Sequence, residues 1–206
     1  MKRLITFGCS ITSGVGLPDP KTQTWGAVVS KHLNLNLVNK GIHGASNKLI
    51  CHEVLNFNFE PSDTVIILWT YEDRYTKFFN KDKYFHFFPS FYTKLNKSYY
   101  KDFHTDYDSK FTNKLYINHI LYFLTNKKLK FYFAGINYKY LNSFTEHNDN
   151  NIPVDFQYFS LRYPKASDNL HTGVQGNLAY GNKMAEKIFL MEKNYHNFKP
   201  LSPKII

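Results

Sequence analysis

The feature that most constrains the fold is an uninterrupted apolar stretch at 64–70, which reads Thr-Val-Ile-Ile-Leu-Trp-Thr. The stretch is rich in β-branched residues and follows a turn formed by Pro61, Ser62 and Asp63. A strand without polar alternation is typical of a parallel sheet that helices cover on both faces. The sequence therefore predicts an α/β protein with this strand in the middle of its sheet.

Strand and helix patterns alternate on both sides of this stretch. Further strands are predicted at 3–8, 35–39 and 129–135, and helices at 22–33, 48–57, 109–126 and through 179–189. This alternation is typical of doubly wound sheets with right-handed crossovers. With 206 residues, the chain is long enough for a substantial core. We expect one domain over 1–206, a three-layer α/β/α sandwich with a parallel sheet in flavodoxin-like order.

Three segments fall outside this alternation. The segment 71–108 is crowded with aromatic residues and lysines and has no clean period. It is predicted to be an insertion, or lid, with short helical pieces that folds over the carboxyl edge of the sheet. The polar, Asn-rich segment 142–165 is predicted to be an irregular loop, and the tail 194–206, which contains two prolines, is expected to be loose.

Composition excludes several classes of protein. The two cysteines are too few for a disulfide framework, and no Cys-x-x-Cys pair indicates a zinc site. No apolar run is long enough to span a membrane, and the apolar stretch after the basic start is too short for a signal peptide. These features favour a cytoplasmic or virion-associated protein.

The net charge of +10 would allow nucleic-acid binding. However, the lysines are scattered rather than clustered, and the joint richness in Lys, Asn, Phe, Tyr and Ile is what an AT-rich coding sequence produces. Net charge alone is a weak functional signal. We therefore do not expect a nucleic-acid partner.

A candidate nucleophile follows the first strand. The strand ends at Gly8, and Ser10 comes two residues later, at the edge where α/β proteins place their chemistry. A serine hydroxyl needs a neutral imidazole to accept its proton. The alternative is that Ser10 only caps the following helix, because serine is a favoured N-cap residue.

An acid and a base lie together near the other end of the chain. Asp168 and His171 are three residues apart, just before the last helix, so one short loop can let the carboxylate bond the imidazole ring. A doubly wound sheet brings this loop back beside the turn after the first strand. The alternative is a surface histidine next to an aspartate that caps the last helix.

Taken in order along the whole chain, these segments resemble the SGNH (GDSL-like) hydrolases. The segment 8–12, Gly-Cys-Ser-Ile-Thr, resembles the family's first block, in which the serine is the nucleophile. Gly44, in the Gly-rich segment 41–47, resembles the glycine of the second block, whose backbone N–H serves the oxyanion hole. Asp168 and His171 resemble the acid and base of the last block.

The resemblance implies a serine esterase or acyl hydrolase. Ser10, His171 and Asp168 would be the catalytic residues, and the N–H groups of Ser10 and Gly44 would hold the oxyanion. Such chemistry requires no cofactor and no metal. The implied substrate is a small-molecule, carbohydrate O-acetyl or lipid ester.

The sequence departs from the family pattern most clearly in the third block. The family places Gly-x-Asn-Asp after the third strand, and the Asn side chain is a further oxyanion donor. Here the strand continues into Trp-Thr-Tyr-Glu-Asp-Arg at 69–74, and Thr70, Tyr71 or Arg74 would have to donate instead. Because losing one donor can cost about 10²–10³ in turnover, the sequence is compatible with weak or narrow activity.

Several residues keep a structural alternative. Cys9, which stands where the family usually has Asp, is expected to be structural rather than nucleophilic. Gly44 is compatible with a simple turn, and Asn47 is expected to cap the helix that follows. His43 lies in the oxyanion turn and is a candidate to line the pocket.

A second class of function also fits the sequence. The missing third-block Asn and the aromatic insertion are compatible with an inactive SGNH-like scaffold that binds a glycan or a partner protein. The insertion's aromatic residues could stack on sugars or acyl chains, or form a lid or an oligomer interface.

Overall fold

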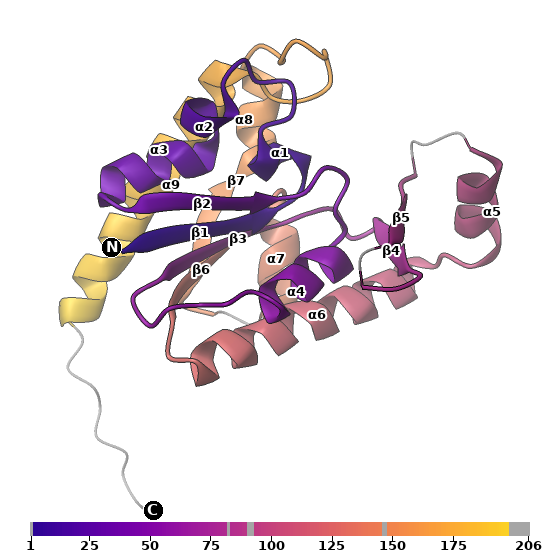
Figure 1. Cartoon of the computed structure of the whole chain (residues 1–206), viewed down its shortest axis with the longest axis horizontal. Helices are drawn as coiled ribbons and strands as arrows, with labels where there is room; N and C mark the ends of the chain where they lie inside the picture. The colour runs from indigo at the N-terminus through magenta and orange to yellow at the C-terminus, as the bar shows by residue number, and fades with distance from the viewer. Residues whose placement is uncertain (1, 82, 90–92, 146–147, 198–206) are drawn as a thin grey trace, which may run out of the picture.

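Five parallel strands form one sheet in the order β2-β1-β3-β6-β7 (Figure 1). The computed structural model describes residues 2–197 apart from 82, 90–92 and 146–147. The strands are β1 (Arg3–Gly8), β2 (Asn36–Gly41), β3 (Thr64–Trp69), β6 (Lys130–Gly135) and β7 (Asn151–Asp155). Each neighbouring pair is parallel. The predicted flavodoxin-like order, with 64–70 in the centre, is confirmed.

Helices cover both faces of the sheet, as predicted. On one face α3 packs against α9, and on the other α4 packs against α6 (Figure 1). These four helices are α3 (Trp25–Leu33), α9 (Val174–Asn197), α4 (Asn47–Leu55) and α6 (Asp106–Asn126). The shorter helices are α1 (Ser10–Ser13), α2 (Pro20–Gln23), α5 (Lys94–Asp102), α7 (Tyr138–Thr145) and α8 (Phe156–Arg162).

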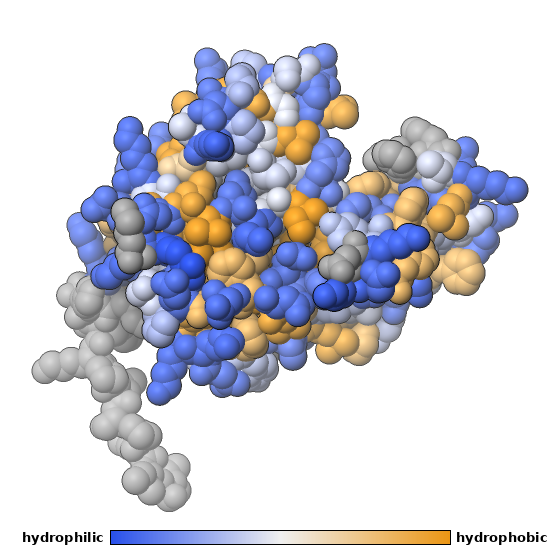
Figure 2. All heavy atoms as spheres, viewed as in Figure 1, coloured by the Kyte–Doolittle hydropathy of each residue, from blue (hydrophilic) through white to orange (hydrophobic). Residues whose placement is uncertain are grey.

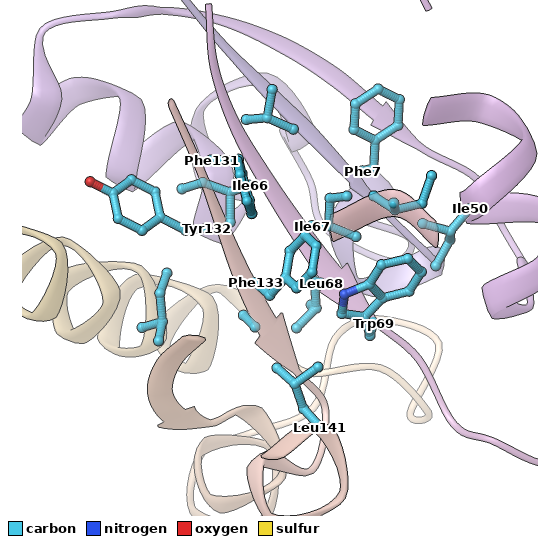
Figure 3. Packing of buried hydrophobic residues seen from close by; sticks show 14 of the residues in the cluster. Phe7, Ile50, Ile66, Ile67, Leu68, Trp69, Phe131, Tyr132, Phe133 and Leu141 are labelled. Atoms are coloured by element: carbon cyan, nitrogen blue, oxygen red, sulfur yellow. The ribbon is translucent and has the colours of Figure 1, made fainter. Parts of the chain in front are cut away.

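The core is built around β3, whose six residues are all buried (Figure 3). Trp69 on β3 meets Phe133 on β6 edge to face, with ring centroids 5.6 Å apart. On the neighbouring strand Phe7 packs in the same manner against Phe57 at 5.6 Å. Edge-to-face ring pairs add to the packing of the core, here between β3 and β6 and between β1 and the segment after α4. The carboxyl ends of the strands therefore form a firm edge from which loops can present polar residues.

The segment 142–165 is not the irregular loop that its composition predicts. It contains the end of α7, the edge strand β7 and helix α8. In β7, Ile152 and Val154 are buried on either side of the exposed Pro153. Because proline lacks a backbone donor, it is confined mainly to sheet edges and bulges, and a polar segment containing one does not read as a strand. The edge position of β7 explains why the pattern was misleading.

The predicted aromatic-rich insertion after the third strand is confirmed, but it contains an antiparallel hairpin as well as helix. Strands β4 (Tyr75–Phe78) and β5 (Tyr84–Phe87) pair with each other, and α5 follows. Tyr99 of α5 packs on Tyr75 and Phe87, with centroids 5.1 and 4.6 Å apart. In Figure 1 the hairpin and α5 extend beyond the carboxyl ends of the strands. The aromatic residues thus give this lobe a small core of its own.

Two remaining expectations concern the tail and the membrane. Helix α9 continues to Asn197, so the first residues of the tail expected to be loose are helical. The rest of that tail, 198–206, lies outside the described residues. Among the described helices, none combines the length and apolar character needed to cross a membrane.

Candidate active site

Ser10 lies where the first strand turns into a short helix. Gly8 ends β1, and a Cβ added there would come within 2.1 Å of the Thr12 hydroxyl, so only glycine lets the chain turn so tightly. Ser10 is the first residue of α1 and is 4% exposed. Cys9 occupies the N-cap position and is fully buried, as expected for a structural residue. Ser10 is therefore not the cap, and its hydroxyl bonds elsewhere.

The hydroxyl of Ser10 is bonded to the imidazole of His171. His171 Nε2 lies 2.9 Å from Ser10 Oγ, although the two residues are 161 positions apart in the chain. The other ring nitrogen, Nδ1, lies 2.5 Å from Asp168 Oδ2. The structure thus brings the three predicted catalytic residues into one hydrogen-bonded chain that runs from carboxylate to imidazole to hydroxyl.

The carboxylate of Asp168 is fixed by its own loop. Its Oδ1 accepts the backbone N–H groups of Leu170 and His171, each at 3.0 Å. The His171 N–H and then the His171 ring lower the pKa of Asp168 to about 2. Asp168 is therefore ionised at neutral pH and can hold the Nδ1–H tautomer of the ring. It does not cap the last helix, which begins at Val174.

This loop docks against the segment that follows α1. The Ser167 hydroxyl and backbone N–H both donate to the Gly16 carbonyl, at 3.0 and 3.3 Å. Within the loop, the Ala166 N–H donates to the His171 carbonyl at 2.9 Å. These bonds connect the loop before α9 to the end of β1, which places His171 over Ser10.

Gly44 lies in the turn after β2, beside the end of β1. The turn begins where Gly41 pairs with Gly8, and Ile42 N–H donates to the Gly8 carbonyl at 3.0 Å. Gly44 has a φ of +75°, and a Cβ there would lie 2.7 Å from Phe88 Cζ. Both the backbone and the space therefore require glycine. Within the described residues, neither the Gly44 nor the Ser10 backbone N–H donates to a protein acceptor.

Asn47, from the start of α4, anchors the backbone at the end of β3. Asn47 Oδ1 accepts the Thr70 N–H at 2.8 Å, and its Nδ2 donates to the Thr70 carbonyl at 3.2 Å and to Asn113 Oδ1 at 2.6 Å. Asn47 is therefore an anchor for the end of β3. It is not the predicted cap, because Ser46 caps α4 by accepting the Leu49 N–H.

The three candidates for the missing oxyanion donor differ in their surroundings. Thr70 is buried, and its hydroxyl has no partner among the described residues. Tyr71 is 43% exposed. Arg74 Cζ lies 5.2 Å from the ring centroid of Tyr71. None of the three is bonded to Ser10 or His171.

Two residues of the hairpin reach the site although sequence reasoning did not assign them to it. His86 and Phe88 both approach Gly44, at 3.2 and 2.7 Å from the position of a Cβ. The ring of His43, the residue expected to line the pocket, lies 6.1 Å from that of His171. The contacts of His86 and Phe88 with the Gly44 turn depend on how the hairpin folds back onto it. No periodic pattern in the sequence indicates this arrangement.

The histidines do not form a metal centre. Across the part of the chain that the structure describes, no three side chains of His, Cys, Asp or Glu are grouped to hold an ion. Burial, followed by the charges of His43 and Arg74, lowers the pKa of His86. His86 is thus biased towards its neutral form.

Comparison with solved structures identifies the fold. The structure is similar to a lipolytic protein of the G-D-S-L family from Desulfitobacterium hafniense (TM-score 0.54, 14% identity, 90% of this chain and 98% of that one). It is also similar to TesA (TM-score 0.59, 14% identity, 94% and 99%) and to the acetyl xylan esterase AlAXEase (TM-score 0.56, 15% identity, 91% and 100%). The protein therefore has the fold of the SGNH (GDSL-like) hydrolases, as the sequence motifs predicted.

Sequence comparison adds nothing to this assignment. No family model matches the chain, and no curated protein matches it. The similarity is therefore one of fold, because these solved structures are only 10–15% identical in sequence to this chain.

Proposed function

We propose that the protein is a serine esterase that cleaves its substrate through an acyl-enzyme. The observation that carries this proposal is the bonded chain Asp168–His171–Ser10, with contacts of 2.5 and 2.9 Å. Few arrangements other than nucleophilic catalysis require a buried serine bonded to an imidazole that a carboxylate orients. The likeness to lipolytic proteins and an acetyl xylan esterase supports esters as the substrate class.

In the first half of the proposed reaction, Ser10 Oγ attacks the ester carbonyl while His171 Nε2 takes the hydroxyl proton. Asp168 stabilises the imidazolium that forms, because its carboxylate faces Nδ1–H. The free N–H groups of Ser10 and Gly44 would stabilise the negative charge that develops on the carbonyl oxygen. His171 then gives its proton to the departing alcohol, which leaves the acyl group on Ser10.

In the second half, a water molecule attacks the acyl group and His171 acts as the base again. The released acid leaves Ser10 and His171 in their starting states. The scheme needs no redox step and no group beyond those that this chain supplies. Carbohydrate O-acetyl esters, lipid esters and simple esters all suit it.

A hydrolysis assay with serine variants tests this proposal. Wild type is expected to hydrolyse p-nitrophenyl acetate and to lose that activity after reaction with a fluorophosphonate. Ser10→Ala should lower kcat by about 10³-fold or more, because the nucleophile is gone. Ser13→Ala, on the same short helix, and Cys9→Ala should keep most of the activity.

Two results would count against the esterase. One is a wild type that turns over no ester and does not react with the fluorophosphonate, and the other is a Ser10→Ala variant as active as wild type. The alternative class, an SGNH-like scaffold that binds a glycan or a partner, would gain support if glycan binding were then lost on changing aromatic residues of 71–108.

A further inference from the structure

Within the described residues, the guanidinium of Arg74 forms no ion pair and no hydrogen bond. Arg74 is half-buried, and its Nη1 is buried without a hydrogen-bond partner. Its contacts are the rings of Tyr71 and Phe88, whose centroids lie 5.2 and 5.4 Å from Cζ. A buried guanidinium nitrogen is normally hydrogen-bonded, so the unpartnered Nη1 makes Arg74 a candidate to bind an anion.

Arg74 lies one aromatic ring away from the turn that carries Gly44. Phe88, which contacts the guanidinium, is the residue whose Cζ would lie 2.7 Å from a Cβ on Gly44. His86 also lies beside Gly44. Burial is the main cause that lowers the pKa of His86, and the nearby charge of Arg74 lowers it further. Arg74 and the Gly44 turn therefore lie against the same ring, that of Phe88.

The charges around this position have both signs. His43 and His86 lie on the side of the Gly44 turn, and Asp73 lies next to Arg74 in the chain. Asp73 and Arg74 influence each other electrostatically but form no ion pair, and burial is the larger effect that raises the pKa of Asp73. The Asp73 carboxylate thus leaves the guanidinium donors of Arg74 unoccupied. Figure 2 shows hydrophobic and hydrophilic side chains interleaved over the neighbouring hairpin and α5.

We propose that Arg74 binds an anionic group of the substrate, a carboxylate or a phosphate, beside the ester that Ser10 attacks. A guanidinium presents a planar fork of donors that suits both groups, and ring contacts limit the orientations it can take. This inference rests on the proposed esterase function and narrows it to esters that carry a negative charge in their acyl or alcohol part. In this role Arg74 determines specificity and does not act on the carbonyl.

Matched esters that differ only in charge test the proposal. On the alcohol side, 4-acetoxybenzoate is compared with 4-acetoxybenzamide; on the acyl side, the mono-4-nitrophenyl ester of glutaric acid is compared with 4-nitrophenyl 5-oxohexanoate. Wild type should show a higher kcat/KM for the anionic member of at least one pair. Arg74→Gln should lower that value by about 10- to 100-fold, the range of a charge-assisted hydrogen bond, and change the neutral member less than about two-fold.

Two controls accompany Arg74→Gln. Arg162 also lies over an aromatic ring, Tyr158, at 3.5 Å, so Arg162→Gln removes a comparable cation–ring contact elsewhere. It should leave the preference unchanged. Arg74→Lys, which keeps the charge but not the fork, should retain part of it. Equal activity of wild type on both members of both pairs would overturn the proposal, and so would an equal loss by Arg74→Gln on charged and neutral esters.

A binding measurement keeps this inference separate from the esterase proposal. Calorimetric titration of the Ser10→Ala protein with 4-hydroxybenzoate, phenyl phosphate and 4-hydroxybenzamide requires no turnover. Binding of at least one anion more tightly than the amide, lost in Ser10→Ala/Arg74→Gln, supports an anion site even if no ester is cleaved. The two anions distinguish a carboxylate from a phosphate. Equal binding of all three, or binding unaffected by Arg74→Gln, contradicts it.

Discussion

At the scale of single residues, the proposed chemistry depends on Asp168 having two tasks. One carboxylate oxygen bonds the His171 ring, and the other holds the backbone N–H groups of Leu170 and His171. The first bond orients the base, and the second shapes the loop that carries it. A substitution can therefore separate the two tasks.

Asp168→Asn should remove the orienting charge while an amide oxygen can still accept the backbone bonds. Because an amide facing Nδ1 favours the wrong tautomer or leaves the imidazolium unsupported, we expect kcat to fall by about 10³–10⁴-fold with little change in KM. Steady-state kinetics on p-nitrophenyl acetate measure this. Asp168→Ala, which loses both tasks, should also lower the melting temperature. A kcat within ten-fold of wild type in Asp168→Asn would argue against Asp168 as the orienting acid.

Sequence reasoning singled out Ser10 and Gly44 because they follow strands with plain patterns, and Asp168 and His171 because they stand three residues apart just before the last helix. It did not reach His86 or Phe88, which come close to Gly44 through the hairpin. It also placed Asn47 as a cap, whereas that side chain anchors Thr70. Contacts between segments distant in the chain depend on folded geometry, which local patterns do not encode.

At the scale of elements, one ion pair fixes the start of β1 to the turn before β3. Arg3 Nε and Nη2 donate to the two oxygens of Asp63 at 2.8 and 2.7 Å, and the Asp63 side chain is fully buried. Although burial alone would raise it, the bonds to Arg3 and the Glu60 N–H leave the pKa of Asp63 lowered overall. Breaking the pair would leave a buried carboxylate without its cation.

Arg3→Met should lower the free energy of unfolding at pH 7 more than substitution of an exposed lysine does, because the Asp63 carboxylate stays buried without its cation. Since the folded-state pKa of Asp63 is depressed, the pair stabilises the protein above the ordinary aspartate range. That contribution is lost as pH falls below about 4. Urea unfolding at pH 7 and at pH 3 should therefore show a smaller gap between wild type and variant at the lower pH.

Lys183→Met provides the control for this element. Lys183 pairs with Glu186 on the exposed side of α9, and exposed pairs contribute about 0–1 kcal/mol. Its substitution should change the free energy of unfolding by less than about 0.5 kcal/mol. A gap for Arg3→Met that stays constant or grows towards pH 3 would contradict the assigned role of Asp63.

The elements that could be predicted share one property. β1, β3 and β6 are apolar runs with clear boundaries, and their places in the sheet follow from the alternation with helices. β7 was missed because Pro153 interrupts a segment dominated by asparagine. The hairpin was missed because aromatic residues occupy both of its faces, as the contacts Phe78–Tyr84 and Phe85–Phe87 show, so no alternation marks its strands.

At the scale of the whole molecule, we expect the chain to unfold as one domain. The predicted unit 1–206 combines the five-stranded sheet with the hairpin–α5 lobe. A hydrogen bond of 2.7 Å between the hydroxyls of Ser46 and Thr76 links the two parts. Thermal unfolding followed by tryptophan fluorescence and by far-ultraviolet circular dichroism should give coincident transitions. Trp25→Phe keeps Trp69 as the sole tryptophan and should not separate the two curves. Two resolved transitions would show that the lobe or another part unfolds independently.

The α/β fold class and the order of the strands in the sheet could be predicted from the sequence, and the motifs led to the right structural family. The proposed preference for anionic esters could not be predicted, because it is inferred from a lobe with its own small aromatic core. That lobe brings Phe88 between Arg74 and the Gly44 turn. In the proposed scheme, substrate selection belongs to the inserted lobe, and the ester chemistry belongs to the sheet edge.

The most direct test of the central claim, that Ser10 is the nucleophile, is to locate a covalent adduct. The native protein is treated with a fluorophosphonate, digested and analysed by tandem mass spectrometry. We predict one phosphonyl group per chain, on Ser10, with labelling abolished by Ser10→Ala and strongly slowed by His171→Ala. An unlabelled wild type, or an adduct on another residue that persists in Ser10→Ala, would contradict it.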